Sequence, residues 1–195
     1  MNWAAILDAG EESDDALVAR AGRGDRLAAS RLIARHTPKV LAVCARVLGD
    51  RAAAEDAAQE TFLKLWRSAD RWKPGAAKFE TWLYRVATNA CIDRLRQRKP
   101  EAPEEDAPEI ADAAPLADAS MMERERTRLV ERALAALPDR QRMAIVLCHY
   151  QELSNAEAAA AMSVSVDALE SLLARARKSL KESLAPRRAE LIEGA

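Results

Sequence analysis

Apolar side chains recur at helical spacing between Asp14 and Lys99, and short turn signals divide this stretch into successive helices. One turn lies at Gly22–Gly24 and another at Gly49-Asp50, because glycine ends helices readily and aspartate caps the helix that follows. The segment Arg51–Ser68 has an apolar stripe that we expect to be buried, formed by Ala58, Phe62, Leu65 and Trp66. The pattern predicts an all-helical N-terminal unit.

The next segment combines a loop, a core helix and a basic helix end. Pro74-Gly75 predicts a loop over Ala69–Lys78. Beyond it, the residues at the spacing of a buried helical face are Phe79, Trp82, Leu83, Val86 and Ala90. Six basic residues against two acidic ones lie from Lys78 to Lys99. Such a helix end with aromatic residues nearby suits phosphate contact and base stacking, but a solvated helix end beside core aromatic residues has the same pattern.

Composition changes abruptly at Pro100–Ser120, which has four prolines and seven acidic residues but no basic one. Too few apolar side chains are present to form a core, so the stretch is predicted to be a flexible, extended linker. Its ~20 residues span at most ~70 Å, at 3.3–3.6 Å each. That length matches roughly two turns of B-DNA at ~34–36 Å per turn. We therefore expect two helical domains, at residues 14–99 and 121–185, with tails at residues 1–13 and 186–195.

The stretch Ser154–Leu184 predicts two short helices separated by a tight turn. Ser154 and Glu157 form a capping box, and Ser165 is the N-cap of the second helix. The second helix has an apolar stripe of Val166, Leu169, Leu172 and Leu173, followed by basic residues. The pattern is typical of a helix-turn-helix whose second helix enters a DNA groove. An ordinary helical hairpin with a solvated basic end is the alternative.

Composition and charge narrow the class of function. The net charge is −1, so any affinity for nucleic acid must come from local patches. Cys44, Cys91 and Cys148 are widely spaced in apolar helical contexts, which favours reduced thiols in the cytoplasm over a disulfide framework. The Cys/His spacing does not predict a metal site. Met1–Asp15 lacks the pattern of a signal peptide, and no long uncharged apolar run predicts membrane insertion.

Three motifs, in this order, resemble the signatures of extracytoplasmic-function (ECF) sigma factors of the sigma-70 family, the minimal initiation factors of bacterial RNA polymerase. They are AEDAAQETFLKLW (Ala54–Trp66), FETWLYRVATNACIDRLRQRK (Phe79–Lys99), and LPDRQRMAIVL followed by LSNAEAAAAMSVSVDALESLLARAR (Leu137–Arg177). The resemblance implies an all-α protein with a region-2 domain, a linker that threads through the polymerase, and a region-4 domain. It also implies that the protein is not an enzyme and needs no cofactor, metal or small-molecule substrate.

The resemblance further implies partners and site residues. The partners are core RNA polymerase (its β′ coiled coil and β flap), promoter DNA and an anti-sigma factor that wedges between the domains, commonly under stress control. The residues that match the polymerase-docking face are Asp56, Gln59 and Glu60. Those that match the minus-ten reading surface are Trp72, Lys73, Lys78, Arg85, Asn89, Arg94, Arg96 and Arg98. Those that match the minus-thirty-five reading helix are Ser165, Glu170, Ser171, Arg175, Arg177 and Lys178. A flipped minus-ten base costs a few kcal/mol of unstacking, which a snug polar pocket must recover.

Glu152 and Ala158 depart from the glycine and isoleucine that the family usually has there. More important, Glu170 and Leu172 stand where many members have basic residues. A carboxylate accepts a hydrogen bond from cytosine N4, so Glu170 is a candidate base reader. Alternatively, Glu170 lowers general DNA affinity and makes binding depend on polymerase. The weakened basicity leaves open a sigma-like decoy that binds an anti-sigma factor without engaging DNA. An enzyme ranks far lower, since the sequence has no phosphate-binding loop and no paired catalytic residues.

Overall fold

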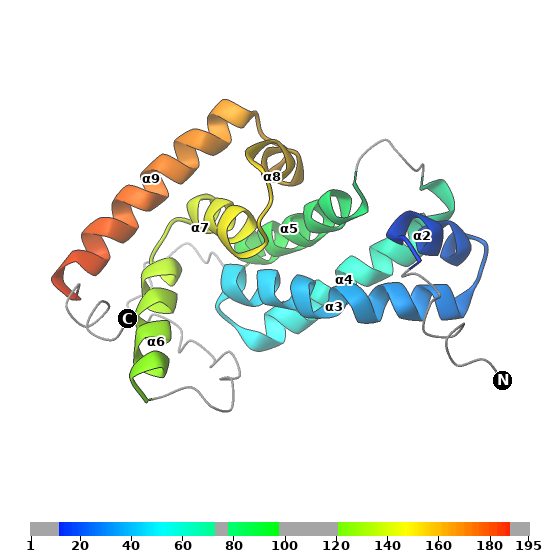
Figure 1. The fold of residues 1–195 in the computed structure, drawn as a ribbon, viewed down its shortest axis with the longest axis horizontal. Helices are drawn as coiled ribbons and strands as arrows, with labels where there is room; N and C mark the ends of the chain where they lie inside the picture. The colour runs from blue at the N-terminus through cyan, green and yellow to red at the C-terminus, as the bar shows by residue number, and fades with distance from the viewer. Residues whose placement is uncertain (1–11, 73–77, 98–120, 188–195) are drawn as a thin grey trace.

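The structure is a computed structural model that describes residues 12–72, 78–97 and 121–187, apart from the side chains of residues 121–124. All regular elements in these ranges are helical, which confirms the predicted all-α class (Figure 1). The N-terminal half contains α2 (Asp14–Gly22), α3 (Arg26–Leu48), α4 (Arg51–Ser68), the 3-10 turn η1 (Ala69–Arg71) and α5 (Phe79–Gln97). The C-terminal half contains α6 (Met121–Ala135), α7 (Asp139–Ile145), the π-helical turn η2 (Val146–Tyr150), α8 (Asn155–Met162), α9 (Val166–Leu184) and the 3-10 turn η3 (Ala185–Arg187).

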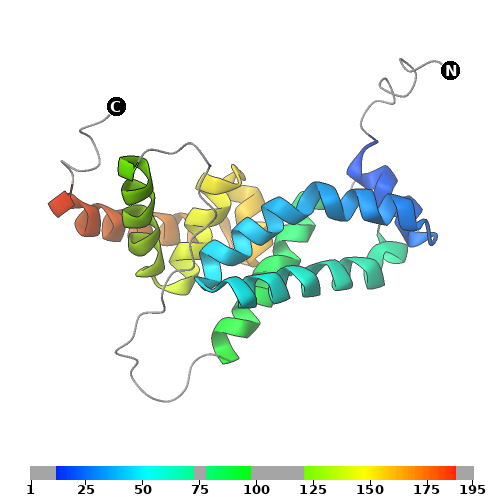
Figure 2. The ribbon, with the colours of Figure 1, turned by 90° about the horizontal axis from the view of Figure 1, so that it is seen from below.

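The helices of the N-terminal half begin and end at the predicted turns. The Asp25 carboxylate accepts hydrogen bonds from the backbone amides of Leu27 and Ala28 and so caps α3. Gly49 adopts a left-handed φ of 64° that ends α3, and the Asp50 carboxylate caps α4 directly afterwards. The short connection makes α3 and α4 lie side by side along most of their length (Figure 2).

The core of the N-terminal half lies between α3, α4 and α5. In α4, Leu65 and Ala58 are buried and Phe62 is half-buried, as the apolar stripe predicts. Trp66 is 48% exposed, so the prediction that it belongs to the buried stripe is wrong. It follows Leu65 by one residue, and the helical rotation of about 100° per residue turns its side chain toward solvent.

An aromatic cluster joins the start of α5 to the N-terminal helices. The ring of Trp72 lies 5.7 Å from Phe79 and 5.8 Å from Trp82, measured between ring centroids, and both contacts are edge-on. The ring of the buried His36 of α3 also contacts Phe79, at 5.2 Å between centroids, and its Nε2 lies 2.8 Å from the Asp14 carboxylate. The cluster therefore fixes both described ends of the segment that connects η1 to α5.

The three cysteines are free thiols, as predicted. Cys44 of α3 and Cys91 of α5 are buried, whereas Cys148 is half-buried. A hydrogen bond with the Cys44 thiol, together with burial, raises the pKa of Cys91. A thiol with a raised pKa stays protonated at neutral pH, so Cys91 acts as a core residue and not as a nucleophile.

The C-terminal half contains the predicted helix-turn-helix. Ser154 and Glu157 form the capping box of α8, in which each side chain accepts a hydrogen bond from the backbone amide of the other residue. Ser163 adopts a left-handed φ of 53° and ends α8, and Ser165 caps α9 by accepting from a backbone amide. Both predicted caps are confirmed.

The apolar face of α9 packs against α6, α7 and α8. Leu169 and Leu173 are buried and Leu172 is half-buried, as the stripe predicts. Val166 is 41% exposed, so its place in that stripe is wrong. Helical side chains tilt toward the N-terminus, and Val166 at the first position of α9 therefore projects past the end of the packed face.

The two halves contact each other in the structure. The α5 helix packs against α8, and α3 approaches α6, α7 and η2, so the buried residues form one continuous cluster (Figures 1 and 2). The predicted linker at residues 100–120 lies outside the described residues, as do most of both predicted tails. The domain boundaries at residues 99 and 121 therefore stay a prediction.

Candidate polymerase and nucleic-acid interface

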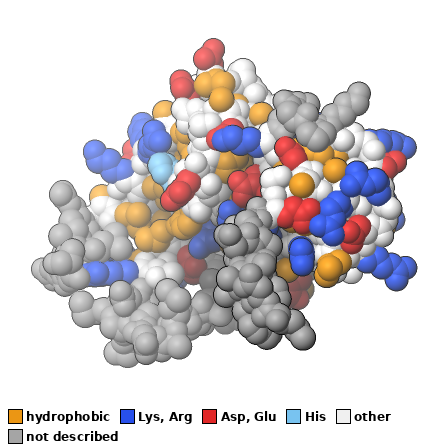
Figure 3. Space-filling view, turned by 45° about the vertical axis from the view of Figure 1, so that its right-hand side comes forward, with side chains coloured by type: hydrophobic (Ala, Val, Ile, Leu, Met, Phe, Trp, Pro, Cys, Tyr) orange, Lys and Arg blue, Asp and Glu red, His pale blue; other side chains and the backbone are white. Residues whose placement is uncertain are grey.

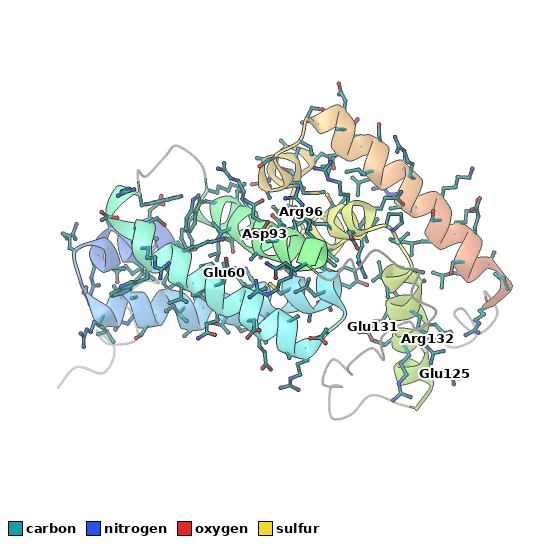
Figure 4. The ribbon with its side chains drawn as sticks, turned by 180° about the vertical axis from the view of Figure 1, so that it is seen from behind. Glu60, Asp93, Arg96, Glu125, Glu131 and Arg132 are labelled. Carbon is teal, nitrogen blue, oxygen red and sulfur yellow. The ribbon has the colours of Figure 1, made fainter. Side chains whose placement is uncertain are left out.

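The α4 helix presents the residues that match the polymerase-docking face. Asp56 and Gln59 are exposed, whereas Glu60 is half-buried and lies beside α5 (Figure 4). The Glu60 carboxylate lies 2.8 Å from Lys64 Nζ and 2.7 Å from Arg94 Nη1. These hydrogen bonds, from Lys64 first and then Arg94, hold the pKa of Glu60 below its ordinary value. Glu60 is thus part of the α4–α5 packing as well as of the candidate face.

Two large apolar side chains extend this face. Leu63 and Trp66 are 49% and 48% exposed, and they follow Gln59 at helical spacing. The outer side of α4 therefore combines polar groups with exposed apolar area, a composition typical of protein–protein interfaces. Helical periodicity placed Trp66 in the core. Its spacing of seven residues from Gln59 and ten from Asp56 instead indicates the outer face of α4, and that signal was missed.

The α5 helix carries an exposed polar stripe made of Arg85, Asn89 and Arg96. These residues recur at spacings of four and seven, so they lie on one side of the helix. Arg96 lies near the end of α5 together with Asp93, whose carboxylate is 3.9 Å away (Figure 4). Arg94 does not join the stripe, because it is turned toward Glu60 of α4.

Two further residues matched to the minus-ten surface have partners inside the protein. The indole Nε1–H of Trp72 donates to Asp15 Oδ1 at 2.9 Å, and its ring lies in the aromatic cluster. Lys78 forms an ion pair with Glu157 of α8 at 2.6 Å, which raises the pKa of Lys78. That ion pair, followed by the hydrogen bonds from Ser154, lowers the pKa of Glu157 to about 2. Two other predicted residues, Lys73 and Arg98, lie outside the described residues.

The α9 helix exposes the residues matched to minus-thirty-five reading. Ser171, Arg175 and Lys178 lie on one exposed side. Glu170 is exposed beside them, and its Oε1 accepts a hydrogen bond from Asn155 Nδ2 at 3.1 Å. The second oxygen of Glu170 has no hydrogen-bond partner among the described residues.

The remaining two α9 residues have local contacts. The Ser165 hydroxyl accepts from the backbone amide of Ala168 at 3.2 Å and is therefore used as a cap. Arg177 Nη2 lies 3.4 Å from the ring nitrogen of His149 in η2. Neither contact buries the side chain.

Figure 3 shows basic and acidic side chains interspersed over the face that it presents. Within the described ranges, no group of three or more His, Cys, Asp or Glu residues is arranged to hold a metal ion. In the same ranges, no helix has both the length and the apolar character needed to cross a membrane.

Comparison with known proteins identifies the family. Residues 32–101 match the model of sigma-70 region 2, and residues 127–180 match that of sigma-70 region 4. The chain is 31% identical over 173 residues to the ECF RNA polymerase sigma factor SigW of Bacillus subtilis, covering 83% of this chain and 91% of that protein. The chain belongs to the ECF sigma factors. The resemblance inferred from the three motifs is therefore confirmed.

This sigma factor is also similar to a second relative and to a solved structure. It is 32% identical over 167 residues to the ECF RNA polymerase sigma factor SigE of Mycolicibacterium smegmatis, covering 84% of this chain but 64% of that protein. It is similar to the solved structure of CnrH in complex with the cytosolic domain of CnrY, with 31% identity and a TM-score of 0.66. That similarity covers 90% of this chain and 99% of the solved one. The candidate stripes of α5 and α9 lie within the two matched regions.

Proposed function

We propose that this sigma factor binds core RNA polymerase and directs it to promoters with two elements. The α4 face around Asp56 and Gln59 docks on the β′ coiled coil. The α5 stripe reads the minus-ten element, and α9 reads the minus-thirty-five element. The exposed polar stripe on α5 carries this proposal, because a basic helix side with a central amide offers phosphate contacts and hydrogen bonds to a base edge.

The proposed division of labour follows from the side chains. Arg85 and Arg96 neutralise phosphates on either side of Asn89, whose amide donates to and accepts from a flipped base. Trp72, whose indole donates to Asp15, is held against Phe79 at the start of α5, where its ring supplies an aromatic surface for the flipped base. On α9, Arg175 and Lys178 contact phosphates, while Glu170 accepts from cytosine N4. The sigma factor contributes binding energy and catalyses no reaction itself, and it acts in the cytoplasm with the polymerase.

An anti-sigma factor is the proposed regulator. CnrH, which resembles this chain over nearly its whole length, was solved in complex with the cytosolic domain of CnrY. We propose that a comparable protein partner covers the outer side of α4, where Leu63 and Trp66 expose apolar area. Such a partner competes with polymerase for the same face and is released under stress.

Run-off transcription tests the proposed function. The template is a promoter located by mapping transcript starts after overexpression of the chain. We expect product when core polymerase and the chain are combined and none with either alone. No product from any mapped promoter, together with failure to capture core polymerase in a pull-down, would instead support the sigma-like decoy that Glu170 motivates.

A further inference from the structure

We propose that α2 positions the minus-ten reading surface, and that Asp15 is a positioning residue that acts through Trp72. The proposal rests on the proposed function, because that function gives Trp72 its role toward the flipped base. Three residues of α2 carry the argument, namely Asp14, Asp15 and Gly22. The helix lies wholly before residues 32–101, which match the model of sigma-70 region 2.

The end of α2 lies directly against the backbone of η1 (Figures 1 and 2). A Cβ atom built on Gly22 would lie 2.5 Å from the carbonyl oxygen of Ala69 and 2.9 Å from the backbone nitrogen of Asp70. Only glycine allows two backbone segments to approach this closely, so any other residue at position 22 would push η1 away. Because Trp72 directly follows η1, the position of α2 determines where the backbone of Trp72 lies.

The start of α2 holds the side chain of Trp72. The indole Nε1–H of Trp72 donates to Asp15 Oδ1 at 2.9 Å, although the two residues are 57 positions apart in the sequence. Edge-on contacts with Phe79 and Trp82 confine the same ring. Because an indole has a single donor, an acceptor in a fixed place selects one of the ring orientations that packing alone would allow. Asp15 therefore sets the direction of the aromatic surface offered to a base.

Asp14 extends the contact to the start of α5 through the buried His36. The Asp14 Oδ2 atom lies 2.8 Å from Nε2 of His36, which is only 2% exposed. The His36 ring in turn contacts the ring of Phe79, the first residue of α5. The other oxygen of Asp14 accepts from Arg35 Nη1 at 2.7 Å, so both carboxylate oxygens are used within the protein. The same helix therefore holds the chain on both sides of the connection from η1 to α5.

Orientation matters because a flipped base is held by few contacts. Flipping costs a few kcal/mol of unstacking, so each remaining contact must have good geometry. Loss of a complete base–aromatic contact lowers affinity about five- to 150-fold. Loss of the orientation of Trp72 leaves its ring in place, and the expected effect therefore lies at the lower end of this range. In this account Asp15 contacts no DNA itself.

The test uses holoenzyme formed from core polymerase and the full chain, on a promoter located by transcript mapping. Substitution of 2-aminopurine at each minus-ten position in turn identifies the flipped base, because its fluorescence rises when it leaves the stack. Asp15→Ala removes the acceptor for the indole, whereas Asp15→Asn keeps a side-chain oxygen in its place. Asp70→Ala removes an exposed carboxylate of η1 and is the control for charge.

The lifetime of the open complex is compared on the intact promoter and on one that lacks the flipped base. On the intact promoter we expect Asp15→Ala to shorten the lifetime about five- to tenfold. Asp15→Asn should restore most of it, and Asp70→Ala should behave as wild type. On the abasic promoter Asp15→Ala and wild type should be equal, because Trp72 has no base to stack on. An equal loss on both promoters, or no loss on either, would overturn positioning through Trp72.

A second variant reaches the same surface through the backbone. Gly22→Ala keeps every polar contact of α2 but adds a methyl group that must displace η1. It should also shorten the lifetime on the intact promoter and have no effect on the abasic one. A loss that is independent of the base would show that α2 only supports the fold.

A measurement on the wild-type chain guards against folding defects in the variants. Nuclear magnetic resonance should show slower solvent exchange for the indole N–H of Trp72 than for that of the exposed Trp66. Equally fast exchange would overturn the contact between α2 and Trp72. If the holoenzyme gives no transcript from any mapped promoter, the proposed function fails, whereas the exchange rates still decide whether α2 holds Trp72.

Discussion

The α5 and α9 helices both carry basic residues, yet they are embedded in the protein in different ways. α5 is enclosed by α3 and α4 on one side and by α8 on another, so Arg94 and the neighbouring Lys78 are engaged in ion pairs. α9 is packed along a single face, and Arg175 and Lys178 are exposed. A basic residue in the sequence is therefore not always available to DNA.

The difference matches the tasks proposed for the two helices. A pocket for a flipped base must be rigid, because it recovers the cost of unstacking through a few well-placed contacts. A helix that lies in a groove needs exposed charge and only a few base contacts. On this view α5 supplies a rigid site between the phosphate contacts of Arg85 and Arg96, whereas α9 supplies mainly exposed charge. Substitutions in the two helices should therefore have different effects.

The largest effect is expected on α5. Asn89→Ala should reduce run-off transcription about ten- to hundredfold, since a lost pair of hydrogen bonds to a base costs about 1–3 kcal/mol. Core-polymerase binding should be unchanged, because Asn89 lies on the exposed side of α5 and is not part of the docking face on α4. Gln97→Ala removes an exposed amide at the last residue of α5, about 80° around the helix from Asn89, and serves as the control. Equal losses for both variants would contradict a specific pocket.

A change of base preference is expected on α9. Glu170→Gln should move the preferred base from cytosine to adenine at one minus-thirty-five position, because an amide pairs with adenine and a carboxylate with cytosine. The discrimination is expected to be about 1–3 kcal/mol. Asn155→Ala should weaken the cytosine preference without changing its identity, since Asn155 only orients Glu170. Transcription from a promoter library with randomised minus-thirty-five positions measures both, and an unaltered preference would exclude Glu170 as a reader.

The salt dependence of promoter binding should distinguish exposed arginines from those that form ion pairs within the protein. Arg175→Ala should reduce the slope of log affinity against log salt by about 1, as expected for one lost phosphate contact. Arg94→Ala should leave the slope nearly unchanged, because Arg94 already pairs with Glu60. The measurement is promoter binding by the holoenzyme over a salt titration. Equal changes of slope for the two variants would show that Arg94 of α5 and Arg175 of α9 contact phosphates to the same extent.

The smallest effect concerns the pH dependence of stability. The folded-state pKa of Glu157 is lowered from 4.5 to about 2, so its stabilising contribution is present above pH 4.5 and is lost as the pH falls toward 2. Glu157→Gln should lower the free energy of unfolding by about 0.2–1 kcal/mol near neutral pH, because glutamine still completes the capping box and only the surface ion pair with Lys78 is lost. The difference from wild type, measured by urea unfolding, should shrink as the pH falls below 4.5.

Local features of the fold could be predicted from the sequence because their causes are local. Asp25, Asp50, Ser154 and Ser165 cap helices through backbone amides two or three residues away. Helical periodicity likewise identified most of the buried stripes. It misassigned Trp66 and Val166, because periodicity shows which residues share a face but not where the packed sector ends.

The second buried face of α5 could not be predicted in this way. Thr81, Tyr84 and Thr88 are uncharged and recur at helical spacing, which is a weak signal for a packed face. Their partner is α8, which lies far along the chain and has no local relation to α5. For the same reason the sequence marked Lys78 as a DNA contact but did not reveal its pairing with Glu157.

Footprinting of the promoter tests the central claim most directly. The account predicts that the chain alone protects neither element, and that core polymerase with the chain protects both the minus-ten and the minus-thirty-five regions at once. Protection of both elements by the chain alone, or of only one element by the complete holoenzyme, would contradict the claim that two helical halves read separate elements only when assembled with polymerase.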